Sequence, residues 1–310
     1  MEEYTLLVLH KLEHTFGYYD VLTGKRLATL NTLEYPHEIC LDPGRSKIYI
    51  AEMGVRGIES EGKGGHTVAV FDLKARERIS TIDTGHYDRP HGIAAYGTNL
   101  YVTSESTKHL MMYDLGTEEL IDAVYLDQEC AHMVGISPDG TRAYTANIRS
   151  NSITAVDTVA LKVLQHIPVL ERPEGMVFSP DGKWMYCVCR EAKAAVVVDC
   201  DKGEMADKIV TGNGPVRVVI TPEGGRLVIP LFHSAAVDVA ETSIRKVTHT
   251  IPVGPHPAGT CMSPDGELVF ISCEDENRVY VIHMDTMEIV QKIKTGNGAD
   301  AMVCLHSHEL

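Results

Sequence analysis

The sequence has few aromatic residues and no concentration of positive charge. Only 6% of its 310 residues are aromatic, with one tryptophan and five phenylalanines. The formal net charge is −15 and no run of Lys or Arg occurs, which argues against nucleic acid or an anionic membrane surface as a partner. No apolar run approaches the length of about 18 residues that a transmembrane helix needs. We therefore expect no nucleic acid and no membrane among the partners.

Two further features are missing near the N-terminus and among the cysteines. Residues 1–4 (Met-Glu-Glu-Tyr) do not begin a basic segment followed by a long apolar one, so no signal peptide is visible. The eight cysteines include no Cys-x-x-Cys pair. Those in strand-like segments are expected to be small buried hydrophobic side chains. These absences predict a cytoplasmic protein with reduced thiols.

A repeated turn sequence organises the chain. Residues 137–140 read Ser-Pro-Asp-Gly, the same four residues recur at 179–182 and 263–266, and residues 221–224 (Thr-Pro-Glu-Gly) are a close variant. The repeat length is 42 residues. Proline, aspartate and glycine each favour a tight turn for a different backbone reason. A unit of about 40 to 45 residues that contains several short strands is typical of a β-propeller blade.

Aligning the repeats predicts an all-β, seven-bladed β-propeller that forms a single domain over residues 1–310. The aligned starts of the inner strands are His37, His91, His132, Glu174, Val216, Ala258 and Asp300. Residues 4–31 hold three strands without an inner strand, and residues 300–305 supply the missing one, so the two ends should complete one blade. Residues 54–65 are rich in glycine and charge, and they are expected to form a lid-like loop insertion in the first blade.

The repeats resemble the YVTN-type β-propeller family. Residues 101–104 (Tyr-Val-Thr-Ser) are close to the motif itself, and residues 144–147 (Tyr-Thr-Ala-Asn) retain its Tyr and Asn. The resemblance covers nearly the whole chain and implies a seven-bladed propeller. It implies little about activity, since this architecture includes lactonases, lyases, other hydrolases and binding proteins.

Inner strands line the central channel of a propeller, so their aligned starts should lie at one level around it. Three imidazoles and nearby carboxylates can bind a divalent metal ion, here Zn, Mn, Mg or Ca, and leave positions open for water or substrate. The alternative is a channel whose polar residues only bind water. The predicted metal ligands are His37, His91, His132, Glu174 and Asp300.

The second strands end at the same channel mouth, because they run antiparallel to the inner strands. Blades five and six contribute apolar residues there (Val216, Leu231, Phe232, Ala258), which predicts an apolar wall opposite a reactive one. The candidate general acids and bases are His10, Glu52, His91 and Glu105. The candidate substrate-binding residues are Arg190, Asn147, Arg89, Arg172, Lys11 and Phe232.

Three classes of function fit these residues. The one favoured by the histidine-rich ring is a metal-assisted lyase that acts by β-elimination on a small carboxylated or sugar-derived substrate. The second is a lactonase-type hydrolase, in which the same metal activates water. The third is a non-catalytic propeller that binds a ligand or a protein.

Overall fold

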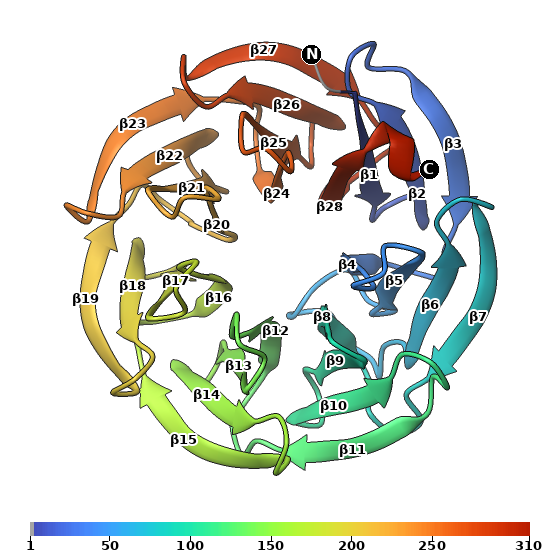
Figure 1. Cartoon of the computed structure of the whole chain (residues 1–310), viewed down its shortest axis with the longest axis vertical. Helices are drawn as coiled ribbons and strands as arrows, with labels where there is room; N and C mark the ends of the chain where they lie inside the picture. Colours follow the sequence, from blue (N-terminus) through green and yellow to red (C-terminus); the bar gives the residue numbers. More distant parts are fainter. Residues whose placement is uncertain (1–2) are drawn as a thin grey trace.

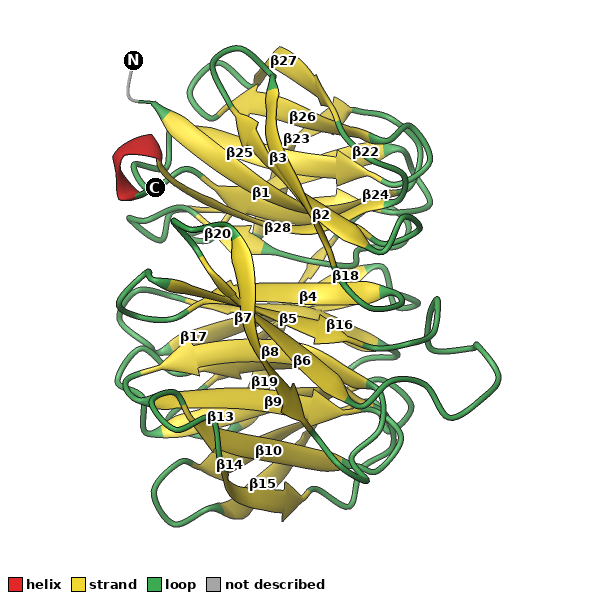
Figure 2. Ribbon diagram, turned by 90° about the vertical axis from the view of Figure 1, so that its right-hand side faces the viewer, coloured by secondary structure: helices red, strands yellow, loops and turns green. Residues whose placement is uncertain are grey.

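The computed structural model describes residues 3–310 and has the predicted architecture. Seven four-stranded antiparallel sheets stand around a central channel as the blades of a β-propeller (Figure 1). Seen from the side, the strands cross the thickness of the ring and the connecting loops gather on its two faces (Figure 2). The fold predicted from the repeats is therefore confirmed.

The blades are numbered from the first complete repeat, and each is given from its inner to its outer strand. Blade one contains β4 (Pro36–Leu41), β5 (Lys47–Glu52), β6 (Thr67–Asp72) and β7 (Glu77–Asp83). Blade two contains β8 (Pro90–Tyr96), β9 (Asn99–Ser104), β10 (His109–Asp114) and β11 (Leu120–Tyr125). Blade three contains β12 (Ala131–Ile136), β13 (Arg142–Asn147), β14 (Ser152–Asp157) and β15 (Lys162–Pro168). Blade four contains β16 (Pro173–Phe178), β17 (Trp184–Cys189), β18 (Ala194–Asp199) and β19 (Glu204–Val210).

Blades five to seven complete the ring. Blade five contains β20 (Val219–Ile220), β21 (Arg226–Leu231), β22 (Ala236–Glu241) and β23 (Lys246–Pro252). Blade six contains β24 (Pro257–Met262), β25 (Leu268–Cys273), β26 (Arg278–His283) and β27 (Glu288–Lys294). Blade seven contains β28 (Ala299–His306), β1 (Tyr4–His10), β2 (Thr15–Asp20) and β3 (Arg26–Asn31). A single turn of 3-10 helix, η1 (Ser307–Glu309), follows β28.

Blade seven closes the ring in the predicted way. The C-terminal β28 pairs with the N-terminal β1, with Tyr4 opposite His306 and His10 opposite Ala299. Both ends of the chain therefore lie on the face opposite the start of β28. This pairing places β1 between β28 and β2, so that β1 is not an edge strand.

The Ser-Pro-Asp-Gly turns join inner strands to second strands. At the first of them, the Ser137 hydroxyl donates to the Asp139 carboxylate at 2.6 Å, which also accepts from the backbone N–H of Thr141 at 3.0 Å. Gly140 has a φ of 73°, a value that a residue with a Cβ rarely adopts. The core lies between neighbouring blades, where apolar faces of adjacent sheets pack together; one such cluster includes Tyr144, Ile153 and Val196.

One inner strand is shorter than expected. In blade five, Pro215 forms only an isolated bridge to Leu231, and β20 is limited to two residues. The intervening backbone instead bonds to the preceding blade four, since Gly175 donates its N–H to the Val216 carbonyl at 3.0 Å. Within residues 3–310, no helix has the length and apolar character needed to cross a membrane.

Candidate functional site

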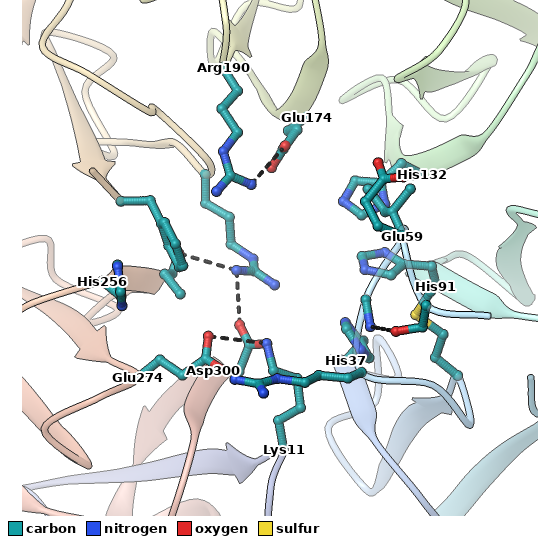
Figure 3. Close-up of a pocket in the computed structure, with 18 of the residues that line it drawn as sticks. Lys11, His37, Glu59, His91, His132, Glu174, Arg190, His256, Glu274 and Asp300 are labelled. Atoms are coloured by element: carbon teal, nitrogen blue, oxygen red, sulfur yellow. Dashed lines mark hydrogen bonds and ion pairs between the residues drawn. The ribbon is translucent and has the colours of Figure 1, made fainter. Parts of the chain in front are cut away.

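A cavity of about 600 Å³ lies at the channel mouth where the inner strands begin. Residues at all seven inner-strand starts, or next to them, contribute to its walls, together with the insertion in blade one. Figure 3 shows three histidines on one side of this pocket and His256 on the other. The aligned starts of the inner strands thus surround a pocket. The residues that line it are Lys11, His37, Met53, Arg56, Gly57, Ile58, Glu59, Ser60, His91, His132, Arg172, Glu174, Arg190, Arg217, Phe232, His256, Ala258, Glu274, Asp275 and Asp300.

β-Bulges direct the first side chains of the inner strands into the pocket. The register of β4 against β5 shifts between Pro36 and Glu38, and that of β8 against β9 shifts between Pro90 and Ile93. Blades three, four and six have the same irregularity at the same place. A bulge frees a residue from the ladder and re-aims its side chain, and bulges are common next to active sites. In each of these five blades, a β-bulge therefore places the first side chain of the inner strand at the level that the repeats predicted.

The three histidines form one continuous wall. The rings of His91 and His132 stack with centroids 3.8 Å apart, and His37 lies tilted against His91 at 5.0 Å. Burial lowers the pKa of His37 to about 3, and the charge of Lys11 adds to the effect. Burial also lowers the pKa of His91 well below its usual range, with His132 and His37 reinforcing it. Neutral imidazoles are the form that binds metal ions.

Glu105 joins two of these histidines in a convergent donor set. Its Oε1 lies 2.6 Å from Nδ1 of His132. One ligand atom from each of His91, Glu105 and His132 lies within 4.8 Å of the others, and all three residues are buried. Nδ1 of His91 and Oε2 of Glu105 are buried without a hydrogen-bond partner. Because buried polar atoms are normally paired, these two fit the role of ligands to a cation.

His37 has a different contact from its two neighbours. Its Nε2 lies 3.1 Å from the carbonyl oxygen of Val55 in the insertion. A carbonyl only accepts, so Nε2 donates there and only Nδ1 remains for any ligand. In the structure, His37 therefore ties the insertion to the histidine wall.

The two acids predicted as metal ligands are paired with cations instead. Glu174 lies 3.2 Å from Arg172 and 3.3 Å from Arg190. Asp300 lies 2.9 Å from Lys11 and 3.0 Å from Arg217. Burial alone would raise the pKa of Asp300, but these two charges outweigh it and hold the pKa well below its usual range. Neither carboxylate belongs to the donor set of the histidine wall, because each faces a basic partner.

Two charged residues that the sequence reasoning missed cross the channel one step deeper. Arg217 of blade five forms an ion pair with Glu38 of blade one, besides its contact to Asp300. At the same repeat position, Gly92 and Gly175 allow the next blade to approach, since a Cβ on Gly175 would lie 2.6 Å from the Cα of Arg217. The aligned residues at this position are Glu38, Gly92, Met133, Gly175, Arg217, Gly259 and Ala301. The sequence could have indicated this ion pair, because one acid and one base occur at a repeat position that is otherwise uncharged.

Arg217 also changes the wall predicted to be apolar. Phe232 and Ala258 line the pocket, but Val216 and Leu231 are buried behind it. The guanidinium of Arg190 lies 4.7 Å from the centroid of the Phe232 ring. The wall predicted to be apolar thus carries the aromatic ring of Phe232 together with two cations, Arg190 and Arg217.

A histidine–aspartate pair lies on this same wall. The ring of His256 stacks on Phe232 with centroids 4.4 Å apart, and its Nδ1 lies 2.7 Å from Asp275. His256 lies in the loop that enters blade six, and it lines the pocket. A carboxylate on one ring nitrogen fixes the orientation of the other, as in general acid–base pairs.

Three predicted site residues at the ends of second strands lie outside the pocket, as do Arg89 and Glu105, which line a smaller neighbouring cavity. His10 uses both ring nitrogens inside blade seven, at 2.8 Å from Tyr19 and 2.8 Å from Thr15. Glu52 accepts two hydrogen bonds from Arg78, at 3.0 and 2.9 Å. Asn147 donates to the hydroxyl groups of neighbouring β14. All three come last in a second strand, where their side chains point into their own blade and not into the channel.

Lys11 and Arg89 are placed near the mouth but have structural contacts. Lys11 lies between Asp300 and Glu274, at 2.9 and 3.3 Å. Burial alone would lower the pKa of Lys11, but these two acids outweigh it and raise the pKa. Arg89 donates to three backbone carbonyls of the insertion, those of Ile58, Ser60 and Gly62. Arg89 therefore holds the insertion over the mouth rather than facing the pocket.

Several known proteins share this architecture. Antigen Lp49 of Leptospira interrogans serogroup Icterohaemorrhagiae serovar copenhageni is 24% identical over 224 residues, which are 66% of this chain and 49% of that protein. The chain thus spans about half the length of this curated relative. Hydrazine synthase of Kuenenia stuttgartiensis superposes with a TM-score of 0.74 at 20% identity, covering 86% of this chain and 88% of that one.

A second solved structure, named a "putative 6-phosphogluconolactonase" from Bacteroides uniformis, has a TM-score of 0.80 at 16% identity and covers 98% of this chain and 100% of that one. At such identities, the likeness to solved structures shows the fold alone. The family model for the YNCE-like beta-propeller matches residues 126–309, more than half of the chain. The matching model is the YNCE-like one, so the comparisons support the propeller prediction at the level of the fold family and leave the YVTN-type resemblance as a prediction. The chain belongs to the YNCE-like β-propeller family.

Proposed function

We propose that this protein is a hydrolase that opens a small, anionic, sugar-derived lactone in the channel pocket with the help of a divalent metal ion. The observation that carries the proposal is the convergence of buried donors from His91, Glu105 and His132. The two histidines line the 600 Å³ cavity, and Glu105 lines a smaller neighbouring cavity. Two imidazoles and one carboxylate are a donor set found in catalytic zinc sites that keep an open position. The second support is the set of arginines around the same mouth.

The donor set also narrows the choice of ion. Nitrogen ligands suit Zn²⁺ or Mn²⁺ better than Mg²⁺ or Ca²⁺, which prefer all-oxygen sites. His91, Glu105 and His132 would hold the ion. When bound, it would supply a Lewis acid and acidify a water molecule. The 2.6 Å contact between Glu105 and His132 fixes the orientation of that imidazole.

The other walls would bind and orient the substrate. Arg172 and Arg190 are the candidates to pair with an anionic group, because both contact the carboxylate of Glu174 and the further contact of Arg172, to Glu59, is 4.0 Å long. Phe232 offers an apolar face for the sugar ring. In the reaction, the water oxygen bonds to the lactone carbonyl carbon and the ring C–O bond breaks. The attacking water gives up one proton and the released alkoxide takes up one, and His256, oriented by Asp275, is the candidate proton donor on that wall.

The lyase predicted from the sequence is the second candidate, and one observation favours it. His256 lies on the wall opposite the three histidines (Figure 3), where β-elimination needs a base to remove a proton next to a carboxylate. Hydrolysis of a lactone releases acid without creating a double bond. Elimination from a uronate creates an unsaturated product that absorbs ultraviolet light.

Metal content is the first test. Untagged wild-type protein, a His91→Ala/His132→Ala variant and an exposed-histidine control, His249→Ala, are compared by plasma emission spectrometry. We expect close to one ion per chain in the wild type and the control, and loss of the ion in the double variant. A wild type without metal would contradict the metal-assisted mechanism.

Turnover is then measured on a panel of sugar lactones and uronates with and without anionic substituents. Acid release followed by titration reports hydrolysis, and ultraviolet absorbance reports elimination. We expect acid release that falls at least about 100-fold in His91→Ala. Absorbance without acid release would replace the hydrolase with the lyase, and neither signal would favour a binding propeller.

A further inference from the structure

Glu59 places a carboxylate between two arginines of different blades at the pocket mouth. Its Oε2 lies 3.1 Å from Nη2 of Arg149, which follows the last residue of β13 by two positions. Its Oε1 lies 4.0 Å from Nη1 of Arg172, just before β16. Both oxygens of one side chain therefore face guanidinium groups, an arrangement that these groups also offer to phosphate.

Glu59 lowers the local excess of positive charge from two to one. Three guanidinium groups, those of Arg149, Arg172 and Arg190, meet two carboxylates, those of Glu59 and Glu174. The Glu174 side chain is 7% exposed and held by two arginines, whereas that of Glu59 is 71% exposed. Without Glu59 the local excess is two positive charges, in a chain whose net charge is −15.

The Glu59 side chain can leave without displacing the insertion. The backbone there is fixed independently, because Arg89 donates to the carbonyls of Ile58, Ser60 and Gly62. Residues Ile58 to Ser60 separate the main pocket from a smaller cavity of about 290 Å³ that Arg149 lines. Exposed ion pairs contribute little to stability, so a competing anion displaces this one at little cost.

From this geometry we infer that Arg149 and Arg172 form a binding subsite for a dianionic phosphate monoester, which Glu59 fills when no ligand is bound. The subsite deepens the proposed function, since it names the anionic group that the substrate of the same pocket carries. A dianion neutralises the local excess of two charges, and a carboxylate does so only in part. Ligands without an anionic group leave Glu59 in place.

Binding is tested by isothermal titration calorimetry with glucose 6-phosphate, glucuronate and glucose at low salt in a buffer without phosphate. The proteins are the wild type, Glu59→Gln, Glu59→Gln/Arg149→Gln and a matched control. The control is Asp207→Asn, which removes the acid of another exposed pair, 2.8 Å from Arg245. We expect Glu59→Gln to bind glucose 6-phosphate about three- to tenfold more tightly than the wild type, and Asp207→Asn to leave the affinity unchanged.

The added Arg149→Gln change should remove that gain, and added salt should weaken binding to Glu59→Gln. The proposal is overturned by unchanged or weaker affinity in Glu59→Gln, or by equal affinity of that variant for glucuronate and glucose 6-phosphate. Binding requires no turnover, so these results do not depend on the proposed hydrolysis. His91→Ala/His132→Ala should retain its affinity for glucose 6-phosphate; loss there, with affinity retained in the Arg149 variant, would place the phosphate on the metal and overturn the subsite.

Discussion

At the scale of single residues, His10 and His91 show how two buried histidines differ in what they can do. Both rings of the pair are shielded from solvent, but His10 has a partner at each nitrogen whereas Nδ1 of His91 has none. A fully paired imidazole is part of the packing of its blade. An unpaired one beside Glu105 is available to a ligand.

His10 should make the stability of the protein depend on pH. Burial lowers its pKa to about 4, with Arg26 contributing, and its value in an unfolded chain is about 6.5. The depressed pKa means that its contribution is complete above pH 6.5 and is lost as the pH falls toward 4. Between pH 7 and pH 4.5 this loss amounts to about 2–3 kcal/mol.

We therefore expect His10→Gln to lose less unfolding free energy than the wild type over that pH range. Urea unfolding at pH 7 and pH 4.5 measures the difference, with the exposed His249→Gln as control. Equal pH dependence in His10→Gln and the wild type would show that His10 is not the group responsible.

The repeat alignment predicted the level of a residue in the channel but not the direction of its side chain. His37, His91 and His132 reach the pocket because each inner strand has a bulge at that place. Glu52 and His10 each end a second strand, and the extra residue of the bulge lies on the inner strand opposite. The alternation of side chains along a regular second strand therefore directs these two residues into the blade. A bulge depends on contacts between blades, which no local sequence pattern reports.

At the scale of elements, β28 and β1 provide the ladder that joins the two ends of the chain. Every residue of β1 is buried, and the side chains of Leu7, Leu9 and Leu305 pack in one cluster with blade one. The sequence predicted this pairing because only one inner strand was missing and only one was left over. The position of each strand in the repeat was sufficient to predict this pairing, because strand pairing depends on the whole segment and not on the direction of a single side chain.

Leu305→Ala should therefore weaken the closure of the ring. Leu305 is fully buried, and removing its side chain leaves a cavity that typically costs about 2–5 kcal/mol. The control is Val290→Ala on the outer strand β27, where Val290 is 54% exposed and the change should stay within about 0.5 kcal/mol. Chemical denaturation measures both; similar losses in the two variants would argue against a special role for the β28–β1 contact.

At the scale of the whole molecule, the ring is held by two kinds of contact. Neighbouring blades pack through side chains, whereas blade seven is joined through backbone hydrogen bonds between strands from the two chain ends. The number of blades and the closing blade were predictable from the period of 42 residues. The ion pairs across the channel were not, because they join residues as far apart as Glu38 and Arg217.

Circular permutation separates the two kinds of contact. With the original ends linked, new ends between Gly85 and His86 would leave every blade continuous, so that only packing closes the ring. New ends between Gly97 and Thr98 would split blade two and close it by strand pairing. We expect the first permutant to unfold faster in urea than the second, as measured by stopped-flow fluorescence. Equal unfolding rates would mean that packing alone suffices.

The ion pairs that cross the channel beneath the pocket affect how substrate and product can move through the ring. Arg217 contacts Glu38 and Asp300, and Asp300 in turn contacts Lys11, so the passage is spanned by charged side chains from three blades. We therefore expect substrate and product to use the pocket mouth and not the far end of the channel. Whatever enters the pocket departs by the same route, so a departing product and an arriving substrate exclude each other. Inhibition by product should accordingly be competitive with substrate.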